Sequence, residues 1–169
     1  RIDELAASIV ADTGKLTEEA LVHEIAIVAD TIGYYARRGE RALRPERARM
    51  GMLVHKRGMR LYQPLGVVGV ISPWNYPFML AMTPVVTALA AGSTVVVKPS
   101  EVTPRTGLLL GELFAPTGPR DPLAGAVQVV TGGAGTGEAL VRGGVELVCF
   151  TGSAATGRRV MEAAADTLT

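Results

Sequence analysis

The chain has 169 residues, of which 48% are hydrophobic and 20% are charged. This length and composition are typical of one globular domain with a sizeable core. The formal net charge of +1 argues against a nucleic acid or a membrane surface as a partner, because binding either usually needs a basic excess. A single cysteine, Cys149, excludes an internal disulfide and a cysteine-rich metal site, and we expect no bound metal.

The beginning of the chain gives no sign of a leader sequence. Residues 1–4 are polar and already follow a helical pattern, unlike a signal peptide. The longest apolar run, 78–91, is interrupted by Thr83, Pro84 and Thr87 and is too short to span a bilayer. The single cysteine fits a reducing cytoplasm, so we expect a cytoplasmic protein. Because the first residue is not methionine, we also expect a piece of a longer protein.

Residues 1–43 are expected to form N-terminal helices. The first helix has an apolar face at Ile2, Leu5, Ile9 and Val10. The second is predicted to have Thr17 as its N-cap, followed by acidic residues that suit the positive end of the helix dipole. Its core-facing positions form one continuous stripe at Leu21, Ile25, Val28, Ile32 and Tyr35. Two arginines followed by Gly39 predict the end of this helix.

Residues 44–64 form a basic connection. Between 44 and 60 there are six basic residues and one acid, Glu46. A solvated connection or a subunit contact is favoured here over a phosphate-binding patch. Two β-like runs, Met52–His55 and Met59–Gln63, flank the segment 56–58, and they predict a hairpin.

Residues 65–169 alternate between strands and helices. Short apolar runs without alternation predict buried parallel strands at 67–71, 94–97, 126–130 and 146–150. Helical patterns occupy 78–91, 104–114, 137–141 and the segment from Thr156 onward. Gly92 is expected in a left-handed cap, and Thr103 is expected to be the N-cap before Pro104. The fold class is therefore α/β, a partial doubly wound parallel sheet preceded by N-terminal helices and a hairpin.

Four loops follow the carboxyl ends of these strands, where ligands bind in sheets of this kind. They are 72–77, 98–101, 131–137 and 151–157. The third has a G-x-G-x-G spacing and not the G-x-G-x-x-G of the dinucleotide fingerprint, and the fourth lacks the Lys and Ser/Thr of a phosphate-binding P-loop. Each glycine-rich loop taken alone is equally compatible with a tight turn.

Taken together, the loops resemble the aldehyde dehydrogenase superfamily. The resemblance rests on PLGVVG at 64–69, PWNYP at 73–77, KPSE at 98–101 and FTGS at 150–153, in the order and at roughly the spacings of the family. It implies oxidation of an aldehyde to a carboxylic acid. In that reaction a cysteine thiolate attacks the carbonyl, the resulting oxyanion expels hydride to a nicotinamide, and water releases the acid.

The resemblance implies that Asn75 is the catalytic residue of this segment, donating its side-chain amide to the oxyanion. From the residue alone, a turn asparagine that bonds its own backbone is the alternative. Lys98 and Glu101 match the family's pair for the adenosine ribose, and a solvated surface pair is the alternative. The cofactor is expected to be NAD, with NADP also possible. The implied cofactor-binding residues are Ile71, Ser72, Pro73, Trp74, Lys98, Ser100, Glu101, Gly133, Gly137, Phe150, Thr151, Gly152, Ser153, Thr156 and Gly157.

The nucleophilic cysteine and the general-base glutamate of the family should lie beyond Thr169, so we expect the catalytic domain to be absent and this segment alone to be inactive. His23, His55 and Cys149 are interpreted as structural. The implied partners are a small aldehyde and, for the full-length protein, further copies of itself. The motifs look most like succinate-semialdehyde-type members. A non-catalytic binding or oligomerisation module and an acyl-phosphate reductase relative remain alternatives, although such reductases lack the Trp-Asn-Tyr-Pro constellation.

Overall fold

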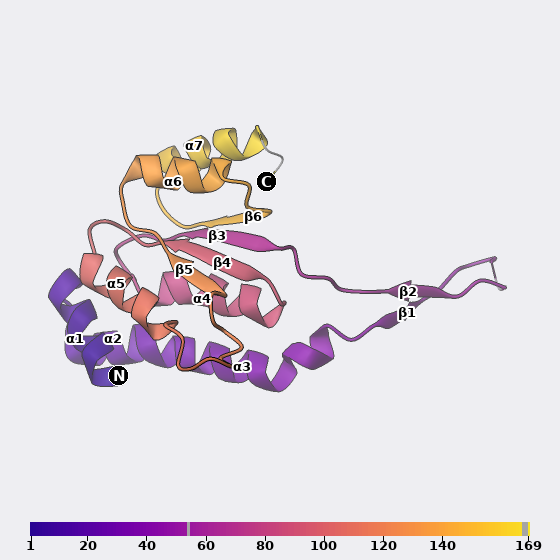
Figure 1. Ribbon diagram of the computed structural model, residues 1–169, viewed down its shortest axis with the longest axis horizontal. Coiled ribbons are helices and arrows are strands. Elements are labelled where there is room, and N and C mark those ends of the chain that lie inside the picture. The colour runs from indigo at the N-terminus through magenta and orange to yellow at the C-terminus, as the bar shows by residue number, and fades with distance from the viewer. Residues whose placement is uncertain (54, 167–168) are drawn as a thin grey trace.

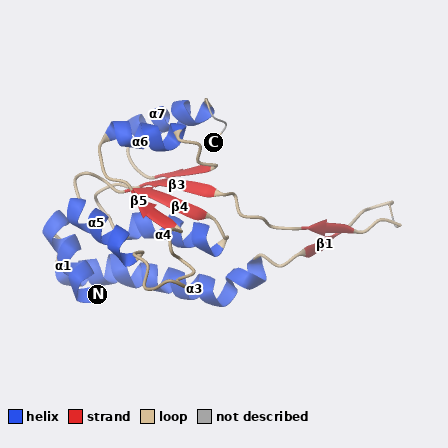
Figure 2. Ribbon diagram, viewed as in Figure 1, coloured by secondary structure: helices blue, strands red, loops and turns tan. Residues whose placement is uncertain are grey.

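The computed structural model describes residues 1–53, 55–166 and 169. A four-stranded parallel sheet lies between two layers of helices, and a two-stranded antiparallel arm projects from one end (Figure 1; Figure 2). The α/β class and the doubly wound parallel sheet predicted from the sequence are confirmed.

The sheet has the strand order β5-β4-β3-β6. Its strands are β3 Val67–Ile71, β4 Thr94–Lys98, β5 Val127–Val129 and β6 Leu147–Phe150. All neighbouring pairs are parallel, and all four predicted strands are present with ends that differ by at most one residue. The chain first adds β4 and β5 on one side of β3 and then returns to add β6 on the other. A switch point therefore lies between the carboxyl ends of β3 and β6.

Helices cover both faces of the sheet (Figure 1). They are α4 Met79–Ala90, α5 Pro104–Leu113, α6 Ala134–Arg142 and α7 Ala154–Ala165. Val68 and Val70 pack into the larger core with α4 and the N-terminal helices, whereas Ile71 packs into a smaller core under α6 and α7. Gly69 also faces α6, because a Cβ there would lie 3.4 Å from the Leu140 side chain. The alternation along β3 thus separates the two cores.

Two helices begin earlier than the sequence suggested. α6 begins at Ala134 and not at Gly137, because Gly133 is extended and is the N-cap. α7 begins at Ala154 because Ser153 is its N-cap. The predicted left-handed cap at Gly92 is confirmed by its φ of 85°. Thr103 does precede Pro104 at the start of α5, but its hydroxyl makes no capping bond.

The N-terminal helices are α1 Ile2–Thr13, α2 Thr17–Ala20, the π-helical turn η1 Leu21–Ile25 and α3 Ala26–Ala42. The prediction of Thr17 as N-cap is wrong, because Leu16 is the extended residue before α2. The stripe is also not continuous, because η1 interrupts it and Ile32 is 48% exposed. Gly39 does not end the helix. It lies buried inside α3, where the backbone hydrogen bonds continue past it to Leu43.

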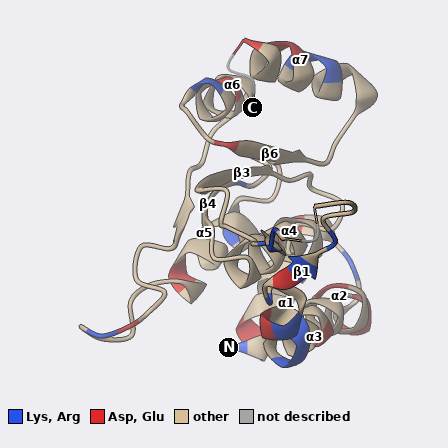
Figure 3. Ribbon diagram, turned by 90° about the vertical axis from the view of Figure 1, so that its right-hand side faces the viewer, with Lys and Arg blue, Asp and Glu red and all other residues tan. Residues whose placement is uncertain are grey.

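The arm consists of β1 Glu46–Ala48 and β2 Gly58–Arg60. The predicted hairpin is confirmed, and the run Met59–Gln63 overlaps β2. Its partner is β1 and not Met52–His55, a run that includes position 54, which lies outside the described residues. Gly58 pairs with Ala48, and glycine suits this position because a Cβ there would clash with the Met50 side chain and would come within 3.3 Å of the Ala48 Cβ and backbone oxygen. Charged residues lie mainly on the helices and the arm, and the strands of the parallel sheet are almost free of them (Figure 3).

Candidate cofactor site

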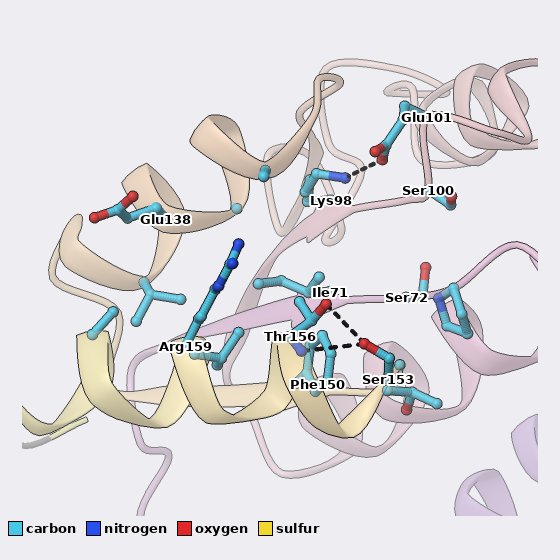
Figure 4. Close-up of a pocket in the computed structure, with 18 of the residues that line it drawn as sticks. Ile71, Ser72, Lys98, Ser100, Glu101, Glu138, Phe150, Ser153, Thr156 and Arg159 are labelled. Atoms are coloured by element: carbon cyan, nitrogen blue, oxygen red, sulfur yellow. Dashed lines mark hydrogen bonds and ion pairs between the residues drawn. The ribbon is translucent and has the colours of Figure 1, made fainter.

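A cavity of about 560 Å³ opens at the switch point, within the size range of ligand pockets in proteins. Its walls come from the carboxyl ends of β3, β4 and β6 and from the facing sides of α6 and α7 (Figure 4). The structure brings together most of the sequence-predicted cofactor residues in this lining: Ile71, Ser72, Pro73, Trp74, Lys98, Ser100, Glu101, Gly137, Phe150, Thr151, Gly152, Ser153 and Thr156.

Backbone hydrogen bonds fix the three strand ends relative to one another. The Ser72 N–H donates to the Lys98 carbonyl at 3.2 Å, and the Thr151 N–H donates to the Ile71 carbonyl at 3.0 Å. Regular strand pairing therefore continues to the edge of the cavity, and the loops begin from a rigid base.

Lys98 and Glu101 lie side by side on one wall (Figure 4). The Lys98 amine donates to a Glu101 carboxylate oxygen at 3.1 Å and to the Pro99 carbonyl at 3.0 Å. The Lys98 side chain is only 6% exposed and that of Glu101 is 58% exposed. Lys98 is therefore not part of a solvated surface pair, which was the alternative interpretation of these two residues. The pKa of the Glu101 carboxyl is lowered, first by a hydrogen bond from the backbone N–H of Glu101 and second by the hydrogen bond from the Lys98 amine. The pair therefore presents a charged acceptor beside a cationic donor.

Ser72 shows that the cavity suits a polar ligand. Its hydroxyl is buried in the lining and has no hydrogen-bond partner within the described part of the chain. A buried hydroxyl without a partner is costly, and a ligand in the cavity could supply the missing bond. The lack of a side chain at Gly137 leaves further space for a ligand. A Cβ there would fill that space, at 3.6 Å from the Lys98 side chain and 3.8 Å from the Ile71 side chain.

The loop after β6 holds itself together locally. The Ser153 hydroxyl accepts a hydrogen bond from the Thr156 N–H at 3.2 Å and lies 3.0 Å from the Thr156 hydroxyl. The Phe150 ring lies against Gly152 and Gly157, and an added Cβ at Gly152 would come within 2.5 Å of it. This compact turn places the positive end of the α7 dipole at the cavity, where it suits an anionic group.

The chain matches the aldehyde dehydrogenase family over residues 1–169. It belongs to that family. It is 42% identical over 166 residues to the "4,4'-diapolycopene aldehyde oxidase" of Methylomonas sp., covering 97% of this chain and 31% of that protein.

Two solved aldehyde dehydrogenases have similar folds. The NAD+ complex of aldehyde dehydrogenase from Bacillus cereus superposes with a TM-score of 0.86 at 30% identity, covering 99% of this chain and 33% of that one. The succinic semialdehyde dehydrogenase of Streptococcus pyogenes in complex with NADP+ gives 0.85 at 25% identity, with coverage of 99% and 35%. The chain thus spans about a third of the length of these aldehyde dehydrogenases.

Three predicted site residues of this chain do not line the cavity: Asn75, Gly133 and Gly157. Gly133 caps α6 and Gly157 packs under Phe150. Asn75 follows Trp74 on the exposed side of the loop after β3. Within the described residues its amide has no hydrogen-bond partner, so the backbone bond of a turn asparagine is not formed.

The structure adds charged residues that the sequence interpretation missed. Glu138 and Arg142 of α6, together with Arg159 and Glu162 of α7, line the outer part of the cavity. Arg142 is paired with Glu138 at 3.0 Å and with Asp166 at 2.6 Å. The Arg159 side chain extends from α7 toward α6 (Figure 4). The i,i+4 spacing of Glu138 and Arg142 was a usable signal for their pairing, but it does not indicate a cavity.

The residues interpreted as structural lie elsewhere. Cys149 is half-buried and packs against the larger core, on the face of the sheet opposite to Phe150. Burial raises the pKa of its thiol, as expected for a structural cysteine. His23 and His55 are not in the lining. Among the described residues no helix is long and apolar enough to cross a membrane.

Proposed function

We propose that this chain is the cofactor-binding part of a longer, cytoplasmic NAD-dependent enzyme that oxidises a small aldehyde to a carboxylic acid. The observation that carries the proposal is the convergence of the three strand-end loops on one cavity at the switch point. Membership of the aldehyde dehydrogenase family supports the reaction class. Residues after Thr169 supply the catalytic domain, and the complete protein assembles as a homo-oligomer.

Different cavity residues contact different parts of the dinucleotide. The Lys98 amine donates to ribose hydroxyls while the Glu101 carboxylate accepts from them, and the start of α7 faces the pyrophosphate. The bound nicotinamide supplies a hydride acceptor. Glu101 disfavours a 2′-phosphate by charge repulsion, which supports NAD over NADP. Arg105, which could have offset this repulsion, lies outside the cavity lining.

Asn75 donates its amide to the oxyanion that forms when the aldehyde is attacked. An amide suits this role because it offers a donor without a charge, and one fixed donor of this kind is worth about 3–4 kcal/mol to the transition state. Support comes from its position beside the cofactor loop and from its amide, which has no partner among the described residues. A donor already used in a turn could not serve.

The test is an assay of the complete protein with short aldehydes, succinate semialdehyde included, and with either NAD or NADP. We expect formation of reduced cofactor and of the carboxylic acid, faster with NAD. Acyl phosphates should not be reduced. A folded complete protein that binds NAD but oxidises no aldehyde would support the alternative of a non-catalytic binding or oligomerisation module. Reduction of an acyl phosphate would support the alternative of an acyl-phosphate reductase.

A further inference from the structure

A fully buried carboxylate lies behind the loop that carries Asn75. Glu24 of η1 has an exposed fraction of 0%, although acidic side chains are rarely buried completely without partners. Its partners come from two parts of the chain that are far from each other in sequence. One oxygen accepts from the Lys15 amine at 2.7 Å, and the other accepts from the backbone N–H groups of Phe78 and Met79 at 2.8 and 3.3 Å.

The two backbone donors are at the start of α4. The first N–H groups of a helix have no partner within it, and here Phe78 is only 5% exposed and Met79 is partly buried. Glu24 supplies both missing acceptors and places a negative charge at the positive end of the α4 dipole. Residues 73–77, which include Asn75, come immediately before these two donors. The carboxylate therefore fixes the point at which this loop joins its helix.

Lys15 holds the same loop through a second contact. Its amine lies 3.7 Å from the centre of the Tyr76 ring, within the range of a cation–π interaction. The Lys15 side chain is 12% exposed, so water competes little with this contact. Tyr76 is the residue directly after Asn75. One ion pair thus contacts the loop on the carboxyl side of Asn75 both through a side chain and through the backbone.

Glu24 lies in the π-helical turn η1. A π turn holds about 4.4 residues because its hydrogen bonds run from i to i+5, and such turns often occur at functional sites. Glu24 lies within this turn, on the buried side that it shares with Ala20 and Val28. This irregularity, which the sequence pattern did not reveal, contains the carboxylate that contacts the start of α4.

We propose that Lys15 and Glu24 are positioning residues that hold Asn75 where its amide can serve the oxyanion. They touch neither substrate nor cofactor and act through the loop 73–77. This inference rests on the proposed function of Asn75. It assigns to the N-terminal helices, which lie far from the cavity in sequence, a part in the geometry of the reaction.

The test compares Glu24→Gln and Lys15→Met in the complete enzyme, together with the double variant that removes both charges and keeps the side-chain volumes. We expect each to lower kcat by about tenfold or more, because small misplacements of a catalytic group have effects of this size. The KM for NAD should stay within about twofold, since most of the cavity lining lies outside this loop, which contributes Pro73 and Trp74. In an Asn75→Ala background, Glu24→Gln should lower kcat no further.

Asp12 offers a matched control. Its carboxylate caps α5 in the same way, accepting from the N–H groups of Thr106 at 2.7 Å and Arg105 at 3.4 Å. Asp12→Asn should therefore weaken a helix start without lowering kcat as Glu24→Gln does. An equal loss of kcat in Asp12→Asn, or a loss from Glu24→Gln that persists in full when Asn75 is alanine, would show that the effect is general destabilisation.

Hydrogen exchange gives a readout that does not depend on activity. In Glu24→Gln the amides of Phe78 and Met79 should exchange faster than in the wild type, with those of Thr106 unchanged, and the reverse should hold for Asp12→Asn. Unchanged exchange at residues 73–79 would overturn the positioning role. If the wild-type enzyme oxidised no aldehyde, the proposed function would be overturned instead. The exchange data alone would then show whether Glu24 holds the loop 73–77. If Glu24→Gln alone does not fold, Lys15→Met and the double variant carry the same comparisons.

Discussion

The loops after β3 and β6 lie at neighbouring strand ends, but they are held in different ways. The loop after β6 is fixed by its own residues, through the Ser153–Thr156 bonds and the Phe150 ring. The loop after β3 is fixed by Glu24 and Lys15 from the N-terminal helices, and it leaves Asn75 exposed.

This difference agrees with the roles proposed for the two loops. A turn that meets a cofactor phosphate needs only its local backbone shape and the helix start behind it. A donor for a developing charge must instead be fixed before reaction and kept out of competing bonds, so it gains from supports elsewhere in the fold. The comparison predicts that substitutions at the loop after β3 change turnover, and that those at the loop after β6 change stability and affinity.

The largest expected effect is on activity itself. Residues 1–169 expressed alone should oxidise no aldehyde, because their one cysteine points away from the cavity and has a raised thiol pKa. Reduced cofactor is measured with aldehyde and NAD present, after circular dichroism has shown that the segment is folded. Turnover that disappears on Cys149→Ala would make Cys149 the nucleophile and overturn the division of roles.

Asn75→Ala in the complete enzyme should lower kcat by a factor of about 10²–10³. The Kd for NAD should hardly change, because Asn75 does not line the cavity. Steady-state kinetics and a cofactor titration measure the two quantities separately. Near-normal turnover would remove Asn75 from the oxyanion role and with it the contrast between the loops.

Glu101 should set the cofactor preference. We expect the wild type to favour NAD in kcat/KM by about tenfold or more, a free-energy difference of roughly 1.4 kcal/mol, and Glu101→Ser to reduce that ratio. Because the pKa of Glu101 is lowered, the carboxylate stays charged at neutral pH, and the preference should weaken only as the pH falls through that lowered pKa. A wild type that prefers NADP would show that Glu101 is wrongly assigned.

Ser153→Ala should lower the free energy of unfolding by about 1 kcal/mol, the usual loss for a helix N-cap, while kcat stays within about twofold. Thr103→Val is the matched control, because Thr103 precedes α5 but its buried hydroxyl has no partner among the described residues. Denaturant unfolding should show the loss for Ser153→Ala only. A large fall in kcat for Ser153→Ala would give the loop after β6 a part in the chemistry.

The smallest effects are expected at Cys149. Its thiol should react with a thiol reagent more slowly than an unfolded cysteine at the same pH, and the rate should rise as the pH approaches the raised pKa. Cys149→Ala should leave the complete enzyme active, with a loss of about 1 kcal/mol in stability for the missing packing. Fast labelling of the folded protein at neutral pH would contradict the half-buried position on β6.

The sequence by itself determined the parts of this protein that depend on neighbours along the chain. The four parallel strands were predicted to within one residue because their apolar runs are short and are bounded by glycine, proline or polar loops, although the edge strand β6 is only partly buried. Gly92 was assigned correctly because a left-handed cap strongly favours glycine. Most of the residues predicted to bind the cofactor do line one cavity, since each follows a strand end and the strand ends meet at one edge of the sheet.

Only the tertiary structure decided the rest, because those features depend on residues that are distant in sequence. Gly39 continues a helix where local propensity favours an end, and Gly58 lies in a strand where Ala48 and the Met50 side chain approach it closely. Arg159 and Glu138 share a cavity wall only because α6 and α7 pack side by side. Glu24 and Lys15 have no recognisable pattern in the sequence. Their role becomes visible only where a π-helical turn brings a buried carboxylate to the first N–H groups of α4, next to Asn75.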